Sequence, residues 1–466
     1  MLTLSATELA RRIRTGAATS REVVETHIAH IEQVNPTLNA VVCERFSEAR
    51  QEADAADERV HTEDPDSLPP FHGVPCTIKE NIALTGMPNT CGVVARKTVI
   101  ADRDAPSVAR LRAAGAIPLG VTNIAEWTAW TATDNRIYGR TNNAYHPART
   151  AGGSSGGEGA AVGSGASPFG LGTDIGGSIR IPAFCNGVFG HKPTGGLVPS
   201  SGQFPNCQGA QARINTTGPL ARRAEDLMPL LRVIAGPHPT DPQSRHFELG
   251  DPSAVDVKDL RILVIDTDGN RPKVSNELRT AASRAAAVLR ALGARVEHPT
   301  ISGLSKAVFG YFGRLLQDGQ WPFALETGPR TLRWASPLKE HILPVAAVNI
   351  LTPPLLRFPA AIHRLTMTAQ SLEAEIDSAL GDDGVLFYPS ATGVAPAHGR
   401  GGALHFRFAL LFNALEMPAT QVPLGLGTAG LPLGLQVVAG RGQDHRTIAV
   451  ALALEKAFGG WTPPKY

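Results

Sequence analysis

The 466-residue chain lacks an excess of charge of either sign and any long apolar run. It has 44 basic and 42 acidic residues and no basic tail, so its charge gives no reason to expect a nucleic-acid partner. No stretch approaches the roughly 20 apolar residues that span a bilayer. Charged residues interrupt the N-terminus before the apolar core of a signal peptide could form. We therefore expect a soluble cytoplasmic protein without a transmembrane segment.

Cysteine is scarce, and its distribution argues against a disulfide framework or a zinc cluster. The five cysteines are odd in number and never form a Cys-x-x-Cys pair, so reduced thiols are the simplest interpretation. The 14 histidines include no His-Glu-x-x-His pattern, and closely paired zinc ligands are missing. We expect neither a metal nor an organic cofactor. The cysteines are Cys43, Cys76, Cys91, Cys185 and Cys207.

The chain does have alternating segments of strand-like and helix-like apolar pattern. Its hydrophobic share of 42% and charged share of 18% are typical of a globular protein. Such alternation favours a mixed α/β fold, with helices on both faces of a sheet. The predicted strands are 73–78, 116–121, 261–265, 294–297, 385–388 and 418–423, and the predicted helices are 104–114, 277–292 and 445–458, the last behind a possible cap at Asp444.

The N-terminal segment, residues 1–60, is predicted to be helical. Ser5 with Glu8, and Thr19 with Glu22, have the spacing of capping boxes. Apolar residues follow at helical spacing, and we expect Asn35–Pro36 to end that helix.

Residues 300–380 differ in composition from the rest of the chain, because they are rich in aromatic residues and interrupted by prolines. We expect a helical elaboration that helps to shape a substrate pocket, although ordinary helical packing would explain the same side chains. The aromatic residues are Phe309, Tyr311, Phe312, Trp321, Phe323 and Trp334.

Glycine is concentrated in one region, where residues 139–202 contain 17 of the 48 glycines. A segment so poor in side chains cannot fill a core. Glycine is favoured where the backbone turns sharply or must approach another group closely. Two clusters stand out, Gly152–Gly157 (Gly-Gly-Ser-Ser-Gly-Gly) and Gly172–Arg180 (Gly-Thr-Asp-Ile-Gly-Gly-Ser-Ile-Arg).

Considered singly, the clusters fit the known uses of glycine-rich loops poorly. A phosphate-binding loop needs Gly-Lys before Ser or Thr, which is absent, and a dinucleotide fingerprint fits Gly163–Gly165 only imperfectly. Gly152–Gly156 matches the Gly-x-Ser-x-Gly elbow of α/β-hydrolases, but that elbow follows a strand and residues 145–150 read as a loop. A Gly/Ser surface loop would explain one cluster and not two. We therefore favour a single site built from both.

Together with an upstream lysine motif, the two clusters resemble the amidase signature family. Gly73–Asn81 (Gly-Val-Pro-Cys-Thr-Ile-Lys-Glu-Asn) is similar to the lysine motif of that family, and the three motifs have its spacing. The resemblance implies a single domain over residues 1–466 with the amidase signature fold, a mixed central sheet covered by helices on both faces. Further segments that carry the resemblance are Gly120–Asn123, Gly190–Thr194, Thr217–Arg222 and Gly434–Val438.

The resemblance implies that Ser178 is a nucleophile, that Ser154 relays its proton and that Lys79 receives it. The peptide bond between Gly153 and Ser154 is expected to be cis. A serine hydroxyl needs a base beside it, and a lysine can be that base near neutral pH when burial lowers its pKa. Lys79 follows the apolar run 74–78, which suits a buried amine. The expected chemistry is hydrolysis of a carboxamide through an acyl-enzyme.

The same resemblance implies an oxyanion hole and a set of supporting residues. This role accounts for the two adjacent glycines, because the carbonyl oxygen of the substrate must come close to backbone N–H groups that no side chain covers. We expect the ion pair within the second cluster to brace the loop, and Asn81 and His191 to be structural. The expected donors are the amides of Ile175, Gly176, Gly177 and Ser178. The expected supporting residues are Gly153, Ser155, Asp174 and Arg180.

Several segments resemble the fatty-acid amide hydrolase branch of the family, particularly its second type. We therefore expect a small-molecule amide with an apolar acyl or aryl group as the substrate. We expect the chain to differ from the membrane-bound members, since no N-terminal spanning helix is predicted within its sequence. A homodimer is expected by analogy. The segments are 84–89, 137–143, 191–193, 202–205, 381–384 and 458–461.

The alternative is the amidase-like subunit of a tRNA-dependent amidotransferase. That subunit usually carries a basic Glu-Val-Lys-Arg-Arg-like motif in its C-terminal half, for which Arg330–Trp334 is a poor substitute. A catalytically dead scaffold is disfavoured, because Lys79, Ser154 and Ser178 are all present.

Overall fold

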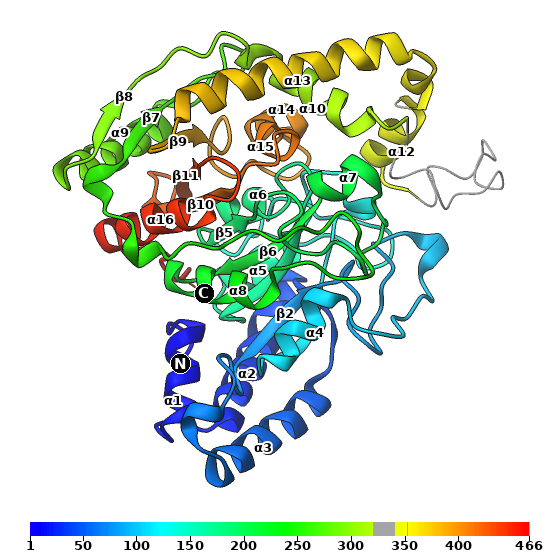
Figure 1. Cartoon of the computed structure of the whole chain (residues 1–466). Helices are drawn as coiled ribbons and strands as arrows, with labels where there is room; N and C mark the ends of the chain where they lie inside the picture. The colour runs from blue at the N-terminus through cyan, green and yellow to red at the C-terminus, as the bar shows by residue number, and fades with distance from the viewer. Residues whose placement is uncertain (320–340, 352, 466) are drawn as a thin grey trace.

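The computed structural model of the chain describes residues 1–319, 341–351 and 353–465. The strands within these residues are β1 (Val41–Glu44), β2 (Pro75–Lys79), β3 (Ile117–Thr122), β4 (Phe169–Asp174), β5 (Phe189–Lys192), β6 (Thr216–Ala221), β7 (Arg261–Val264), β8 (Arg295–Glu297), β9 (Gly384–Pro389), β10 (Ala419–Leu426) and β11 (Pro432–Val438). They form one sheet in the order β1-β3-β2-β4-β6-β5-β10-β11-β9-β7-β8 (Figure 1). This confirms the predicted mixed α/β fold.

The strand directions bring the carboxyl ends of β2 and β4 to the same edge of the sheet. β3, β2 and β4 run parallel to one another, with Thr77 opposite Gly170 and Ile78 opposite Leu171. From β4 to β9 each neighbouring pair is antiparallel, and β9, β7 and β8 are parallel again. Polar residues that end β2 and β4 therefore lie side by side.

Helices cover both faces of the sheet, as β5 illustrates. A Cβ atom at Gly190 would lie 2.6 Å from Cβ of Ala183 in α6 (Arg180–Cys185), whereas His191 contacts Asp444 of α16 (Asp444–Phe458). Successive residues of a strand point to opposite faces, so α6 and α16 pack on opposite sides. The other helices are α1 (Ala6–Arg14), α2 (Ser20–Leu38), α3 (Phe46–Thr62), α4 (Pro106–Ala113), α5 (Gly156–Gly163), α7 (Gly209–Ile214), α8 (Leu227–Ile234), α9 (Asn276–Ala291), α10 (Ala307–Leu316), α12 (Leu343–Leu351), α13 (Pro359–Leu380), α14 (Gly402–His405) and α15 (Leu411–Ala414).

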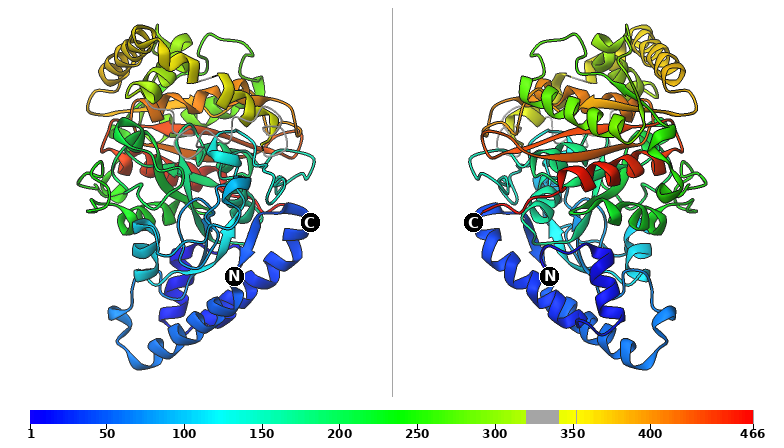
Figure 2. Two further views of the ribbon diagram at one scale, coloured as in Figure 1. Left: turned by 90° about the vertical axis from the view of Figure 1, so that its right-hand side faces the viewer. Right: turned by 90° about the vertical axis from the view of Figure 1, so that its left-hand side faces the viewer.

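The N-terminal segment is largely helical and also adds β1 to the edge of the sheet. Thr19 and Glu22 form the complete capping box, in which each side chain bonds the other residue's backbone N–H. Ser5 accepts a hydrogen bond from the Glu8 N–H, but the Glu8 carboxylate turns to arginines of the same helix instead. α2 and α3 project at the end of the molecule opposite α13 (Figure 2).

Two helix boundaries correct the sequence prediction. α2 continues through Pro36 and ends after the buried Leu38, because proline removes one backbone bond while the last turn still packs into the core. Asp444 is the first residue of α16, not its cap. Its carboxylate accepts hydrogen bonds from the N–H and the hydroxyl of Thr194, which follows β5, and so does not cap the helix.

Five strands of the structure were not predicted from the sequence, namely β1, β4, β5, β6 and β11. β4 contains Gly170 and Gly172, and β6 contains Gly218 and Pro219, so neither has the continuous apolar run of a typical buried strand. Their pairing within the sheet defines them as strands.

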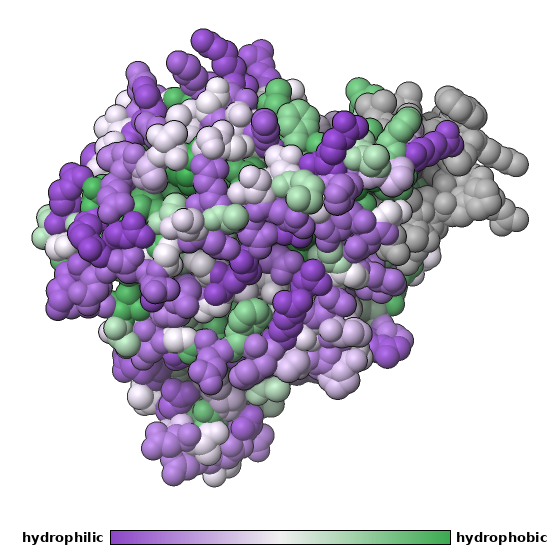
Figure 3. Space-filling model, turned by 45° about the horizontal axis from the view of Figure 1, so that its top comes forward, coloured by the Kyte–Doolittle hydropathy of each residue, from purple (hydrophilic) through white to green (hydrophobic). Residues whose placement is uncertain are grey.

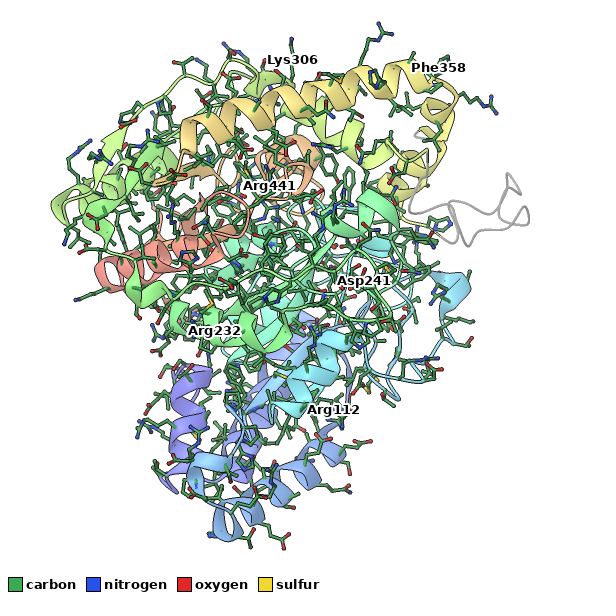
Figure 4. All side chains as sticks on the ribbon, viewed as in Figure 1. Arg112, Arg232, Asp241, Lys306, Phe358 and Arg441 are labelled. Atoms are coloured by element: carbon green, nitrogen blue, oxygen red, sulfur yellow. The ribbon has the colours of Figure 1, made fainter. Side chains whose placement is uncertain are left out.

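The described parts of the 300–380 segment are helical. α10 and α13 pack against each other, and Lys306 and Phe358, which precede them, lie on the outer side of this layer (Figure 4). Phe309 is 58% exposed, whereas Tyr311 is buried. Trp321, Phe323 and residues 330–334, including Trp334, lie outside the described residues.

The surface mixes polar and apolar residues, as the face in Figure 3 shows. In the part of the chain that the structure describes, no helix is both long and apolar enough to cross a membrane. All five cysteines carry free thiols.

Candidate active site

Lys79 ends β2 and is completely buried. Its Nζ lies 2.7 Å from Ser154 Oγ and 2.7 Å from Thr173 Oγ1. Burial lowers the pKa of Lys79 to about 7. Within the described residues no carboxylate forms an ion pair with this amine. A large fraction of Lys79 is therefore uncharged near neutral pH and able to accept a proton.

A second buried group beside β2, the carboxyl of Glu158 in α5, forms no ion pair with Lys79 in the described residues. Its carboxyl group accepts hydrogen bonds from Thr77 Oγ1 (2.6 Å) and Thr122 Oγ1 (2.8 Å). Burial raises the pKa of Glu158 to about 8, so it is largely neutral at pH 7. A Cβ atom at Gly170 would lie 1.8 Å from Glu158 Oε2, which explains the glycine in β4.

Ser154 sits in a backbone turn that admits no side chain before it. The Gly153–Ser154 peptide bond is cis. A Cβ atom at Gly153 would lie 2.7 Å from both Ala132 N and Trp130 O. This close packing of backbone on backbone holds the Ser154 hydroxyl at the amine of Lys79.

Ser178 lies in the turn between β4 and α6, next to the other cluster. The Ser155 N–H donates to the Ser178 carbonyl at 3.3 Å, so the two glycine clusters form one site. Ser178 keeps 6% of its surface exposed, whereas Lys79 and Ser154 are 0% exposed. Of the three residues, only Ser178 can therefore be reached from outside, which distinguishes it from the serine in the Gly-x-Ser-x-Gly pattern.

The backbone amides of residues 175–178 differ in whether the protein already provides them with an acceptor. The Gly177 N–H donates to Asp174 Oδ1 at 2.6 Å, so this amide is already used. Among the described residues, the amides of Ile175, Gly176 and Ser178 have no hydrogen-bond acceptor. Three of the four expected donors are thus free to bond a group that the protein does not supply.

Asp174 and Arg180 form an ion pair that stabilises this turn. Arg180 Nη2 lies 3.0 Å from Asp174 Oδ1 and its Nε lies 3.0 Å from Oδ2, and both side chains are buried. Burial alone would raise the pKa of Asp174, but the Arg180 guanidinium outweighs it and holds that pKa well below its usual range. Asp174 Oδ2 also accepts the Ile179 N–H at 3.1 Å. The pair therefore fixes the backbone on either side of Ser178.

Three residues that complete this network were not singled out from the sequence. Asn413 and Gln436 accept hydrogen bonds from the two terminal nitrogens of Arg180, and Thr173 holds Lys79. Thr173 and Gln436 lie inside motifs that carry the family resemblance, so these motifs could have identified them as candidate site residues. Asn413 had none, because it lies about 230 residues from Arg180.

The side chains of Ser155, His191 and Asn81 form hydrogen bonds with other parts of the protein. The Ser155 hydroxyl donates to the Thr173 carbonyl at 3.2 Å. His191 bonds Thr420 and Asp444 on the α16 side of the sheet, and Asn81 Nδ2 donates to the Phe204 carbonyl. None of these contacts involves the Ser178 hydroxyl.

Breaking the Asp174–Arg180 pair should be costly. Arg180→Met leaves a buried carboxylate without its cation, and we expect the free energy of unfolding to fall by about 3–5 kcal/mol. Chemical denaturation measures this. The control is Arg295→Met, which breaks the exposed ion pair with Asp383 and should cost at most about 1 kcal/mol. Equal losses in the two variants would contradict a bracing role.

An apolar cluster adjoins the turn that carries Ser178. It joins Ile175 of the turn to residues from α7, α10, α12 and α13. The rings of Trp127 and Phe204 lie 5.2 Å apart within it. The cluster contains Cys91, Val93, Ile124, Trp127, Ile175, Phe204, Cys207, Ala212, Ile214, Tyr311, Leu315, Leu316, Val345, Ile362 and Ala414.

Known proteins are similar to this chain in sequence and in fold over nearly its whole length. The model of the family described as Amidase matches residues 22–448. The chain is 43% identical to fatty-acid amide hydrolase 2-B of Danio rerio and 40% identical to fatty-acid amide hydrolase 2 of Homo sapiens, over 100% of this chain and 91% of each relative. It also resembles the solved structure of 6-aminohexanoate cyclic dimer hydrolase complexed with substrate, with a TM-score of 0.81 and 27% identity, over 98% of this chain and 97% of that one. The chain therefore belongs to the amidase signature family and is a hydrolase that acts on amides.

Proposed function

We propose that the chain hydrolyses amides with an apolar acyl or aryl group through an acyl-enzyme on Ser178. The observation that carries the proposal is the 2.7 Å contact between the buried Lys79 amine and the Ser154 hydroxyl. A neutral amine in this position can take a proton from Ser154 while Ser154 takes one from Ser178. The three residues then activate a serine without histidine.

The proposed cycle has two halves. In acylation, Ser178 Oγ bonds to the carbonyl carbon and the π electron pair moves to the oxygen, facing the free amides of the turn. Collapse of this intermediate breaks the carbon–nitrogen bond, and the leaving amine or ammonia takes the proton back through Ser154. Water then attacks the ester by the same route and releases the carboxylate. Asp174 and Arg180 hold the turn and do not touch substrate.

Two observations support an apolar substrate. The apolar cluster reaches the turn at Ile175, so an acyl or aryl group bound next to Ser178 would meet hydrocarbon and aromatic rings. The relatives named fatty-acid amide hydrolase 2 match the chain over its full length.

Labelling with a fluorophosphonate tests the proposal directly. We expect one adduct per chain, located on Ser178 by peptide mapping, and a Ser178→Ala variant that takes up no label. An adduct on Ser154 or elsewhere would overturn the assignment. The same preparation is then offered amides of increasing acyl length, aryl amides and glutamine. Preference for glutamine would favour the amidotransferase-subunit alternative.

A further inference from the structure

Tyr311 of α10 reaches the turn that carries Ser178. Its ring lies in the apolar cluster, with 6% of the residue exposed, and packs edge-on against Phe312 at 5.5 Å. A Cβ atom at Gly176 would lie 3.0 Å from the Tyr311 hydroxyl oxygen. The hydroxyl therefore lies directly against a residue whose backbone N–H is one of the three free donors.

This hydroxyl makes no hydrogen bond to the described residues, and it is not among the fully enclosed side-chain atoms that lack a partner. Since 6% of Tyr311 stays exposed, the hydroxyl is accessible to a molecule that binds beside the turn. Burial raises the pKa of Tyr311 well above its ordinary value, so the group remains a protonated donor across the working pH range. The hydroxyl can therefore donate a hydrogen bond to an acceptor that binds next to Gly176.

One of the donors that the family resemblance implies is already in use, because Asp174 accepts the Gly177 N–H. We propose that the Tyr311 hydroxyl donates a hydrogen bond to the acyl oxygen of the substrate as it becomes negatively charged. It would act beside the amides of Ile175, Gly176 and Ser178. Tyr311 keeps its proton throughout, while the electron pair that arrives on the oxygen comes from the carbonyl π bond. The inference rests on the proposed acyl-enzyme at Ser178.

Removing the hydroxyl alone tests the inference. Tyr311→Phe keeps the ring and its packing, and we expect kcat for an apolar amide to fall about 100-fold with KM changed less than about threefold, as for the loss of one oxyanion donor. The control is Tyr388→Phe, another buried tyrosine, whose ring packs edge-on against Phe408 and Phe412. It should keep wild-type kinetics. Wild-type kcat in Tyr311→Phe, or a loss confined to KM, would overturn the inference.

A second readout separates transition-state stabilisation from a structural effect. A trifluoromethyl ketone forms a tetrahedral oxyanion on a serine, whereas the corresponding alcohol does not. Tyr311→Phe should weaken inhibition by the ketone by the same factor as kcat/KM, and inhibition by the alcohol should stay unchanged. Equal effects on both inhibitors, or on neither, contradict the inference.

Failure of this inference can be told apart from failure of the proposed function. If the fluorophosphonate labels Ser178 and Tyr311→Phe is fully active, only the role of Tyr311 is wrong. If Ser178 is not labelled in the parent chain, both proposals fall. Should the phenylalanine variant not fold, 3,5-difluorotyrosine at position 311 keeps the shape and ionises at lower pH. Activity should then fall at a lower alkaline pH than in the parent, and an unchanged profile would count against the donor.

Discussion

Ser178→Ala should lower kcat for an apolar amide by roughly 10⁵-fold or more, because Ser178 is the exposed one among the serines of the two glycine clusters. Ser154 is the nearest alternative, but it is fully buried and its hydroxyl is already engaged with Lys79. The residual activity should reflect binding and the oxyanion donors alone. Steady-state kinetics with a chromogenic amide, together with a burst measurement in the parent chain, give the number.

The matched control for this prediction is Ser155→Ala. Ser155 is adjacent to the relay serine and equally buried, yet its hydroxyl donates only to the Thr173 carbonyl. Loss of one such neutral hydrogen bond costs about 1 kcal/mol, so we expect about a tenfold effect at most. A Ser178→Ala variant that keeps a tenth of the parent rate, or a Ser155→Ala variant as inactive as Ser178→Ala, would refute the proposed nucleophile.

Lys79→Met should lower kcat/KM at pH 7 by about 10³–10⁴-fold, the typical contribution of a general base together with the activation of its nucleophile. Methionine fills nearly the same volume in a buried site, so the loss reports the amine and not a cavity. The parent enzyme should also gain activity as pH rises through about 7, the pKa to which burial lowers Lys79. The sign follows because only the deprotonated amine accepts a proton, and its fraction increases with pH.

The chain contains its own control for this pH dependence. Lys192 is also completely buried, and burial lowers its pKa to about 7 as well, but its Nζ donates to the Pro193 carbonyl at 2.7 Å. Lys192→Met should therefore keep the rise in kcat/KM near pH 7, whereas Lys79→Met should lack it. If the Lys192 variant loses the rise and the Lys79 variant keeps it, the base has been assigned to the wrong lysine.

The local motifs made the site partly predictable. Lys79 follows an apolar run and ends a strand, so its burial could be expected from neighbouring residues alone. The glycine concentration pointed to bare backbone, and at Gly153 and Gly170 the structure leaves no room for a side chain. The glycine-rich strand β4 could not be predicted from its own residues, because it is a strand only through its pairing with β2 and β6.

The family resemblance and the α/β class could be predicted from the amino-acid sequence. Lys79, Ser154 and Ser178 could be proposed from it as well, because each lies in a short contiguous motif. Which serine is exposed could not be predicted in this way, since Ser154 and Ser178 each follow two glycines and the difference in their burial comes from packing. The tertiary structure also decided that Asp174 uses the Gly177 amide and that Tyr311, more than 130 residues along the chain, lies against Gly176. Burial and hydrogen-bond partners depend on contacts between distant segments, and local sequence patterns carry no record of those contacts.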